Sequence, residues 1–421
     1  RFLQEIRACP VIAGRSQGTA SRPRVLLKGA PGFTPPGVGI MRTSRILFPI
    51  AIALPACMAM GLLGCGHPPA ERELTPISER VLDSARDSST VRWAEGFGFE
   101  AEGTILWLAH DGDTTRWVHG SIPALCSDCI GLPVSTDLEL ATWSTTHVPF
   151  VRAVEAADQW VASGYLSRVE PDSAANPVNL GGDAGLDEEM LLISGADVLT
   201  SYPFGDPMTG VAQRTGIPVM AMAEYAEAHP LGRAEFVKVF GWLTGHRKEA
   251  DAAFHRVESA YLEAKATAMS AAQKEGSPIV FTGSSKGGKW TAPAGDGLVA
   301  RLIADAAGEY AFDPKRAEAL GLNRVGPNYE VEAEQCALLA AECEAFGKVV
   351  HAPEGWTVSD VKNEAPWFDV EGRVVFHCNT AQVDYFGQAI LEPHEMLADL
   401  VHLLHPSSGR RDFVYFQPTG P

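Results

Sequence analysis

Short apolar runs alternate with amphipathic stretches over residues 137–245 of the chain. The runs are typical of buried strands, and the stretches between them repeat their apolar residues at helical spacing. Strands that alternate with helices predict a mainly parallel sheet with helices on its faces. We expect strands at 138–143, 159–163, 197–201 and 218–222 and helices at 148–157, 187–194 and 208–215.

A single long helix is predicted over residues 247–275. Apolar residues recur there at helical intervals, and no Gly or Pro lies between Gly245 and Gly276. A helix of about 29 residues is roughly 43 Å long. This is long for a helix of a globular protein, and its apolar side needs a partner to cover it.

The alternation returns after Pro278, and a different pattern precedes residue 135. Strand-like runs at 103–109 and 115–118 flank Asp111-Gly112-Asp113, a turn signal of hairpins. Beyond the long helix we expect strands at 279–282, 346–350 and 373–376 and helices at 297–307, 329–340 and 392–404. The predicted fold class is α/β, with two doubly wound lobes (135–245 and 277–421) joined by one long rigid helix (246–276) and an N-terminal β-hairpin extension (95–134).

The N-terminal part of the chain carries an export signal. Arg42 and Arg45 precede an uncharged run over 46–64, which closes on Leu-Leu-Gly before Cys65. The segment resembles a lipoprotein signal peptide at 41–64, with Cys65 as the lipidation site and 65–94 as a tether. An uncleaved membrane anchor is the alternative, since a span needs about 20 residues. Residues 1–40 are interpreted as upstream translation outside the fold.

Charge and cysteine content narrow the function. The chain has 34 Lys and Arg against 52 Asp and Glu, a net charge of −18. This argues against nucleic-acid binding, which needs clustered cations. Cys126 and Cys129 form a CxxC pair, for which we expect a disulfide in an oxidising compartment. Zinc binding and redox activity stay open as alternatives.

The chain resembles the periplasmic substrate-binding proteins of ABC importers, in the class for cobalamin, haem and iron-siderophores. The resemblance covers about residues 95–418 and rests on motifs at 143–147, 185–192, 223–233, 300–308 and 397–406. It implies a membrane-tethered, extracytoplasmic monomer without enzyme activity, metal site or cofactor. Such a protein captures a metal chelate or corrinoid between its lobes and delivers it to a permease, which works with an ATPase.

The resemblance also implies the functional residues. Ligands of this class favour broad aromatic walls, and crevices lie where parallel strands end. Six residues near expected strand ends or in the loops of the crevice are the candidate ligand contacts: Trp143, Tyr202, Lys289, Trp290, Tyr329 and Tyr385. Glu189 in the first lobe and Glu334 in the second are the candidate permease-docking residues.

Other functions are favoured less by the sequence. Residues 283–289 match GxxxxGK, but Trp290 stands where a P-loop needs Ser or Thr, and no helix follows directly. The histidines are scattered and no spacing unites them, so a direct metal-ion binding protein is kept only as an alternative. An exported enzyme without a recognisable motif and a scavenging lipoprotein without a permease remain alternatives. The sequence does not choose among siderophore, haem and cobalamin.

Overall fold

The computed structural model describes residues 90–124, 126–169, 175–203, 208–409 and 412–420. The predicted upstream segment, the signal peptide, the lipidation site Cys65 and most of the tether lie outside the described residues. Within the described ranges, no helix is both long enough and apolar enough to cross a membrane.

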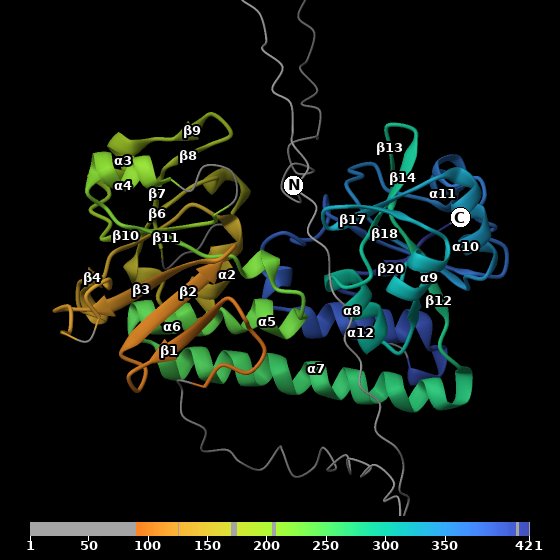
Figure 1. The fold of residues 1–421 in the computed structure, drawn as a ribbon, viewed down its shortest axis with the longest axis horizontal. Helices are drawn as coiled ribbons and strands as arrows, with labels where there is room; N and C mark the ends of the chain where they lie inside the picture. Colours follow the sequence, from red (N-terminus) through yellow and green to blue (C-terminus); the bar gives the residue numbers. More distant parts are fainter. Residues whose placement is uncertain (1–89, 125, 170–174, 204–207, 410–411, 421) are drawn as a thin grey trace, which may run out of the picture. The chain divides into compact units, whose positions relative to one another are not determined.

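The first element after the tether is a four-stranded sheet, which we call the accessory sheet (Figure 1). Its strands are β1 (Phe97–Glu100), β2 (Ile105–His110), β3 (Asp113–His119) and β4 (Ile130–Leu132), in that order. The predicted hairpin is β2–β3, in which His110 pairs with Asp113 across the turn. Asp111 and Gly112 have φ angles of 50° and 88°, and two positive φ values suit the twist of a two-residue hairpin turn. A disulfide joins Cys126 to Cys129 between β3 and β4.

The first lobe is built on a parallel sheet of order β11-β10-β5-β6-β7. Its strands are β5 (Leu140–Thr142), β6 (Trp160–Ser163), β7 (Val178–Asn179), β10 (Val198–Ser201) and β11 (Val219–Ala221), with a small β8 (Gly181–Gly182) and β9 (Gly185–Leu186) ribbon beside them. The helices are α2 (Val148–Ala153), α3 (Glu188–Ile193), α4 (Thr209–Thr215), α5 (Pro230–Glu235) and α6 (Val237–Thr244). The alternation predicted from the sequence is present, with shorter elements.

The long helix is α7 (Arg247–Glu275), whose 29 residues match the predicted range. Its apolar side is covered at both ends. Phe254 is buried in the N-terminal half, where α6 packs, and Ala268 is buried farther on, where α12 (Pro393–Leu404) packs. Figure 1 shows α7 running beneath both lobes. The helix therefore serves as a common support for elements of the two lobes.

The second lobe has a sheet of order β15-β12-β18-β19-β20, parallel except for β20. These strands are β12 (Ile279–Thr282), β15 (Glu309–Tyr310), β18 (Ala345–Val350), β19 (Val374–Asn379) and β20 (Gln417–Pro418). An antiparallel sheet adds β13 (Ser284–Lys286), β14 (Lys289–Pro293), β16 (Asn323–Val325) and β17 (Asn328–Val331). The remaining helices are α8 (Leu298–Asp305), α9 (Pro314–Ala319), α10 (Ala333–Ala341) and α11 (Val358–Glu364).

One predicted element of this lobe is wrong. Residues 329–340 were expected to form one helix, but Tyr329 lies in β17 and the helix α10 begins at Ala333. Tyr329 pairs with Ala292 of β14 and with Arg324 of β16. The backbone hydrogen bonds of this ladder come from distant parts of the chain, which a local helical pattern does not reveal.

The segment that leads into the fold is held by buried carboxylates. Glu235 accepts hydrogen bonds from the backbone N–H groups of Arg92, Trp93 and Ala94, at 2.7–3.1 Å. The Nζ of Lys238 donates to Glu235 at 2.8 Å, so this fully buried carboxylate is both paired and hydrogen-bonded. The tether therefore joins the fold on the side of α5, α6 and α7.

Candidate ligand-binding site

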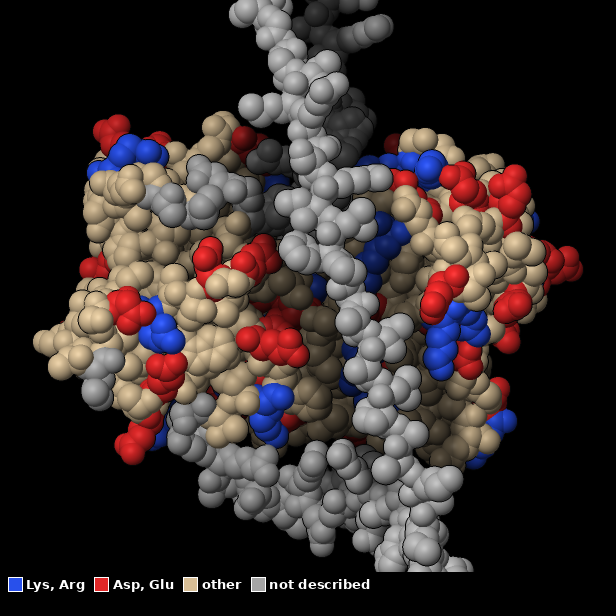
Figure 2. Space-filling view, viewed as in Figure 1, with Lys and Arg blue, Asp and Glu red and all other residues tan. Residues whose placement is uncertain are grey.

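The candidate site lies at the carboxyl edge of the first-lobe sheet. Strands β5, β10 and β11 are parallel neighbours, and the residues that follow them include Trp143, Tyr202 and Tyr225. In open α/β sheets, ligands bind at this edge because the connecting loops gather there. Figure 2 shows the surface recessed between the lobes, with charged side chains on both sides.

A buried polar network holds these loops in place. The Thr146 hydroxyl donates to Glu224 Oε1 at 2.7 Å, and His147 Nδ1 lies 3.0 Å from Thr200 Oγ1. His147 Nε2 is 3.6 Å from Glu224 Oε2, and both side chains are buried. Burial acts to raise the pKa of Glu224, but His147 and the hydrogen bond from Thr146 outweigh it and leave the pKa below its ordinary value. Glu224 thus stays ionised and fixes the loop that carries Tyr225.

Arg233 holds the loop that follows β11. From α5 its guanidinium donates to the carbonyl oxygens of Tyr225 and of Glu227, the latter at 3.0 Å. Burial lowers the pKa of Arg233, and the nearby second-lobe Tyr385 also acts on it electrostatically. Burial raises the pKa of the Tyr385 phenol to about 12. Tyr385 is half-buried and lies edge-on to Phe386, which is 41% exposed.

Trp290, by contrast, is a core residue of the second lobe. Its side chain is 4% exposed, and its indole packs 4.9 Å from Trp367 and 5.7 Å from Phe281, between ring centroids. The indole Nε1–H donates to the carbonyl of Thr282 at 2.9 Å. A ligand has no open face of this ring on which to stack. The structure therefore corrects the expected placement of Trp290 in the crevice wall.

Two other aromatic candidates are also buried. Trp143 is 4% exposed and packs against Tyr165 at 5.3 Å, and Tyr329 is 6% exposed within β17. Both rings offer little surface to a ligand. Among the aromatic candidates, only Tyr202 and Tyr385 are half-buried.

Lys289 is not a free cation. Its Nζ lies 3.1 Å from Glu332 and 3.6 Å from Glu330, and these carboxylates raise its pKa. The glycine-rich segment 283–289 forms the β13–β14 hairpin, with Lys286 opposite Lys289. Gly283 has a φ of 122°, and a Cβ there would lie 2.3 Å from the Trp290 indole nitrogen. The glycines of this segment allow the hairpin turn and the close approach to Trp290. The match to a P-loop motif therefore has a structural explanation.

The two docking candidates are exposed on separate helices. Glu189 lies in α3 and Glu334 in α10, one in each lobe. Glu188 pairs with Arg214, whereas Glu189 has no ion-pair partner among the described residues. Exposed apolar side chains stand beside both: Leu192 and Ile193 in α3 and Leu338 in α10, all 54–65% exposed.

Three polar or aromatic residues at the site were not predicted from the sequence: Tyr225, Arg233 and His110. Tyr225 follows β11 as Tyr202 follows β10, and this shared position was a usable signal. Arg233 lay within a family motif without an assigned role. His110 had no signal, because only the folded chain places the accessory sheet beside β11. Among the described residues, no group of three or more His, Cys, Asp and Glu side chains is arranged to hold a metal ion.

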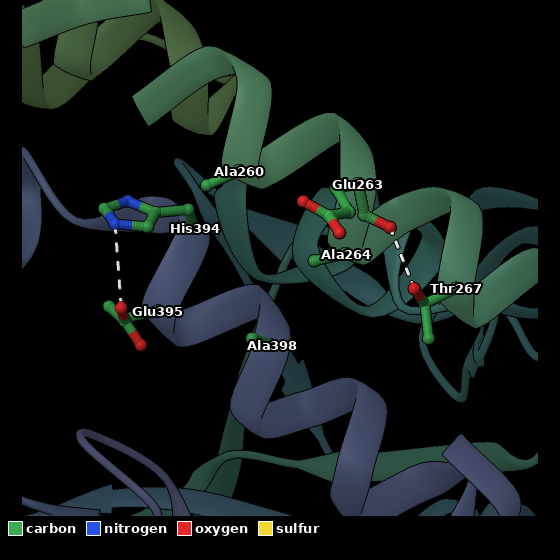
Figure 3. A pocket seen from close by; sticks show the side chains of 7 residues that line it. All are labelled: Ala260, Glu263, Ala264, Thr267, His394, Glu395 and Ala398. Atoms are coloured by element: carbon green, nitrogen blue, oxygen red, sulfur yellow. Dashed lines mark hydrogen bonds and ion pairs between the residues drawn. The ribbon is translucent and has the colours of Figure 1, made fainter. Parts of the chain in front are cut away.

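A pocket of about 230 Å³ lies elsewhere, between α7 and α12 (Figure 3). It is lined by Ala260, Glu263, Ala264, Thr267, His394, Glu395 and Ala398. The Thr267 hydroxyl donates to the Glu263 carbonyl of its own helix, at 3.0 Å. Three of the seven lining residues are alanines, so the pocket is a gap left by small residues on facing helices.

Sequence comparison gives one partial match. No family model matches the chain. An uncharacterized lipoprotein of Methanocaldococcus jannaschii is 25% identical over 252 residues, and the match covers 57% of this chain and 56% of that protein. The chain thus matches little more than half the length of this relative.

Solved structures extend the comparison to the architecture. A periplasmic heme-binding protein from Pseudomonas aeruginosa superposes with a TM-score of 0.51 at 15% identity, over 67% of this chain and 98% of that one. An ABC transporter substrate-binding protein from Listeria monocytogenes gives a TM-score of 0.49 at 15% identity, over 64% and 99%. The chain has the two-lobed fold of the periplasmic binding proteins whose lobes are joined by one long helix.

Proposed function

We propose that the chain is the extracytoplasmic substrate-binding component of an ABC importer. It captures a metal chelate or corrinoid between its lobes and delivers it to a permease. The observation that carries the proposal is the architecture: two α/β lobes supported by one continuous 29-residue helix, with aromatic and charged residues at the carboxyl edge of the first-lobe sheet. The Pseudomonas aeruginosa protein with a similar fold is a periplasmic heme-binding protein, which supports a ligand of this kind.

The arrangement of side chains supports binding without chemistry. Tyr202, Tyr225 and Tyr385 offer half-buried rings, and Arg233 supplies a cation at the junction of the lobes. Aromatic rings suit a large planar or macrocyclic ligand because they bury much area at a low entropic cost. Propionate or carboxylate groups of such a ligand would find their counter-charge at Arg233.

Delivery requires contact with a membrane partner, for which two surfaces are suited. Each combines an exposed glutamate with exposed leucine or isoleucine one helical turn away: Glu189 with Leu192 and Ile193, and Glu334 with Leu338. Exposed apolar side chains beside an unpaired charge are typical of the core and rim of a transient interface. We assign these two helices to permease docking.

Attachment to the membrane follows from the same proposal. Cys65 is the lipidation site, and the lipoprotein name of the Methanocaldococcus jannaschii relative agrees with it. About 25 residues separate Cys65 from Thr90, and a fully extended chain of that length spans roughly 85 Å. Such a tether leaves the domain room to turn its docking surfaces toward the permease.

A thermal-shift series tests the proposal. The full chain, purified in detergent, is heated with haemin, cyanocobalamin, cobinamide, ferrioxamine, Zn²⁺ and Mn²⁺ in separate samples. A ligand that binds only the folded state raises the melting temperature by mass action, by an amount that reflects about 2.7 kcal/mol at 100 times its Kd. A shift with one chelate or corrinoid and none with the bare ions is expected. A shift with bare Zn²⁺ or Mn²⁺ alone would contradict the proposal, as would turnover of the bound molecule.

A further inference from the structure

The accessory sheet reaches the candidate site. Its β2–β3 turn lies beside the short 3₁₀ helix Glu224–Ala226 that follows β11 (Figure 1). The ring of His110, the last residue of β2, meets the ring of Tyr225 edge-on, with centroids 6.2 Å apart. His110 is 27% exposed, so part of its imidazole remains open to a ligand.

Two groups from other segments act on the same tyrosine. Burial, followed in order by the nearby Glu224, Asp111 and Tyr202, raises the pKa of Tyr225 to about 12. Asp111 belongs to the accessory sheet and Tyr202 follows β10. Three separate segments thus bring one imidazole, one carboxylate and two phenols together at the carboxyl edge.

The accessory sheet is fastened to the first lobe and to α7 away from this turn. At the other end of β2, the carbonyl of Gly103 accepts hydrogen bonds from Trp242 Nε1, at 3.0 Å, and from the Arg247 guanidinium. Farther along the sheet, the two ring nitrogens of His119 lie 2.6 and 3.0 Å from the carbonyl oxygens of Pro133 and Trp242. A sheet fastened in this way is a pre-organised support for a binding residue.

The His110 imidazole is arranged as a metal-binding histidine would be. Its Nε2 lies 3.2 Å from Asp111 Oδ2, and its Nδ1 has no hydrogen-bond partner among the described residues. A histidine that binds a metal typically donates its other ring N–H to a carboxylate, which fixes the tautomer and turns the free lone pair toward the metal. Histidine nitrogen and tyrosine oxygen are both known ligands of haem iron.

We infer that the accessory sheet forms part of the crevice wall, and that His110, oriented by Asp111, contacts the metal ion of the bound chelate. The inference rests on the proposed function and narrows its ligand. The site takes a chelate whose metal keeps an open coordination position, with Tyr225 and Tyr202 beside the chelating ring. A siderophore complex that already fills every coordination position of its iron gains nothing from His110.

Haemin and protoporphyrin IX form a matched pair of probes, because they share the ring and differ in the metal. Each is titrated into the full chain and into the variants His110→Ala and Asp111→Asn, with binding followed by the Soret absorption. Thr114→Ala is the control, since Thr114 is exposed on β3, pairs with Ala109 across the hairpin and makes no side-chain hydrogen bond to another described residue. Thermal unfolding of each variant without ligand checks that the fold is intact.

We expect wild-type chain to bind haemin, and His110→Ala to weaken this binding about 10- to 100-fold and shift the Soret band. Asp111→Asn should also weaken haemin binding, but less than His110→Ala does. Protoporphyrin IX binding and the Thr114→Ala variant change less than about threefold.

Two results separate failure of the inference from failure of the proposed function. Equal effects of His110→Ala on haemin and on protoporphyrin IX, or no effect on either, would overturn the metal contact and leave the importer role standing. The same holds if the wild-type chain binds ferrioxamine and not haemin. If no chelate or corrinoid of the thermal-shift series binds, the proposed function fails and the inference falls with it.

Discussion

Replacing Trp290 by alanine separates a core role from a ligand-stacking role. The side chain is 4% exposed, and a buried tryptophan removes about 150–250 Å² from water. At about 25 cal/mol per Å² this corresponds to roughly 4–6 kcal/mol, close to the 3–5 kcal/mol typical of large aromatic-to-alanine changes. The lost indole hydrogen bond leaves the Thr282 carbonyl without that donor, at a further cost of about 1 kcal/mol.

The assay is urea unfolding of the full chain, followed by circular dichroism, together with a ligand titration on the folded protein. Trp290→Ala should lower the free energy of unfolding by about 3–5 kcal/mol. Trp290→Phe keeps a ring and removes the hydrogen bond, so it should cost about 1–2 kcal/mol. Affinity per folded molecule should stay within about threefold of wild type in Trp290→Phe. If Trp290→Ala kept the stability of the wild type but lost ligand binding, the assignment of Trp290 to the core would be wrong.

Three further changes test other parts of the molecule. Tyr202→Ala should weaken ligand binding by about 1–3 kcal/mol in a titration, because its half-buried ring directly follows β10 at the carboxyl edge; unchanged affinity would remove it from the site. Glu189→Arg should spare ligand binding and impair uptake in cells, and normal uptake would count against docking on α3. Burial acts to raise the pKa of Asp305, but hydrogen bonds from Lys265 and Tyr261 hold it below its ordinary value. The unfolded chain therefore binds the proton more tightly, so this carboxylate stabilises the fold above about pH 4, and the contribution is lost as the pH falls through the lower folded pKa. Asp305→Asn should make the free energy of unfolding, measured in urea, less dependent on pH between pH 3 and 6. An unchanged pH dependence would contradict the pairing.

The surfaces assigned to docking and to ligand binding are separate in the fold. Glu189 and Glu334 lie on exposed helices, whereas Tyr225 and Arg233 lie at the carboxyl edge and the lobe junction. Variants on one surface should therefore leave the other function intact. This independence allows uptake and binding to be measured as distinct properties of the same chain.

The elements that depend on local pattern were predictable from the sequence. The range of α7 followed from a helical period without an interrupting Gly or Pro, because each turn of a helix is closed by residues four apart. The hairpin at Asp111-Gly112 followed from a turn that tolerates positive φ at both residues. The alternation of strands and helices predicted the parallel sheets, since a crossover must return the chain to the same edge.

Only the tertiary structure decided which aromatic residues face a ligand and which fill the core. Trp290 and Tyr202 were both expected to follow a predicted strand. Trp290 packs against Trp367, which lies 77 positions away in the sequence, whereas Tyr202 is half-buried. The strand at Tyr329 likewise depends on pairing with β14. His110 meets Tyr225 across 115 residues of chain. Contacts of this kind depend on how the sheets and helices pack in space, and a local sequence pattern carries no record of that packing.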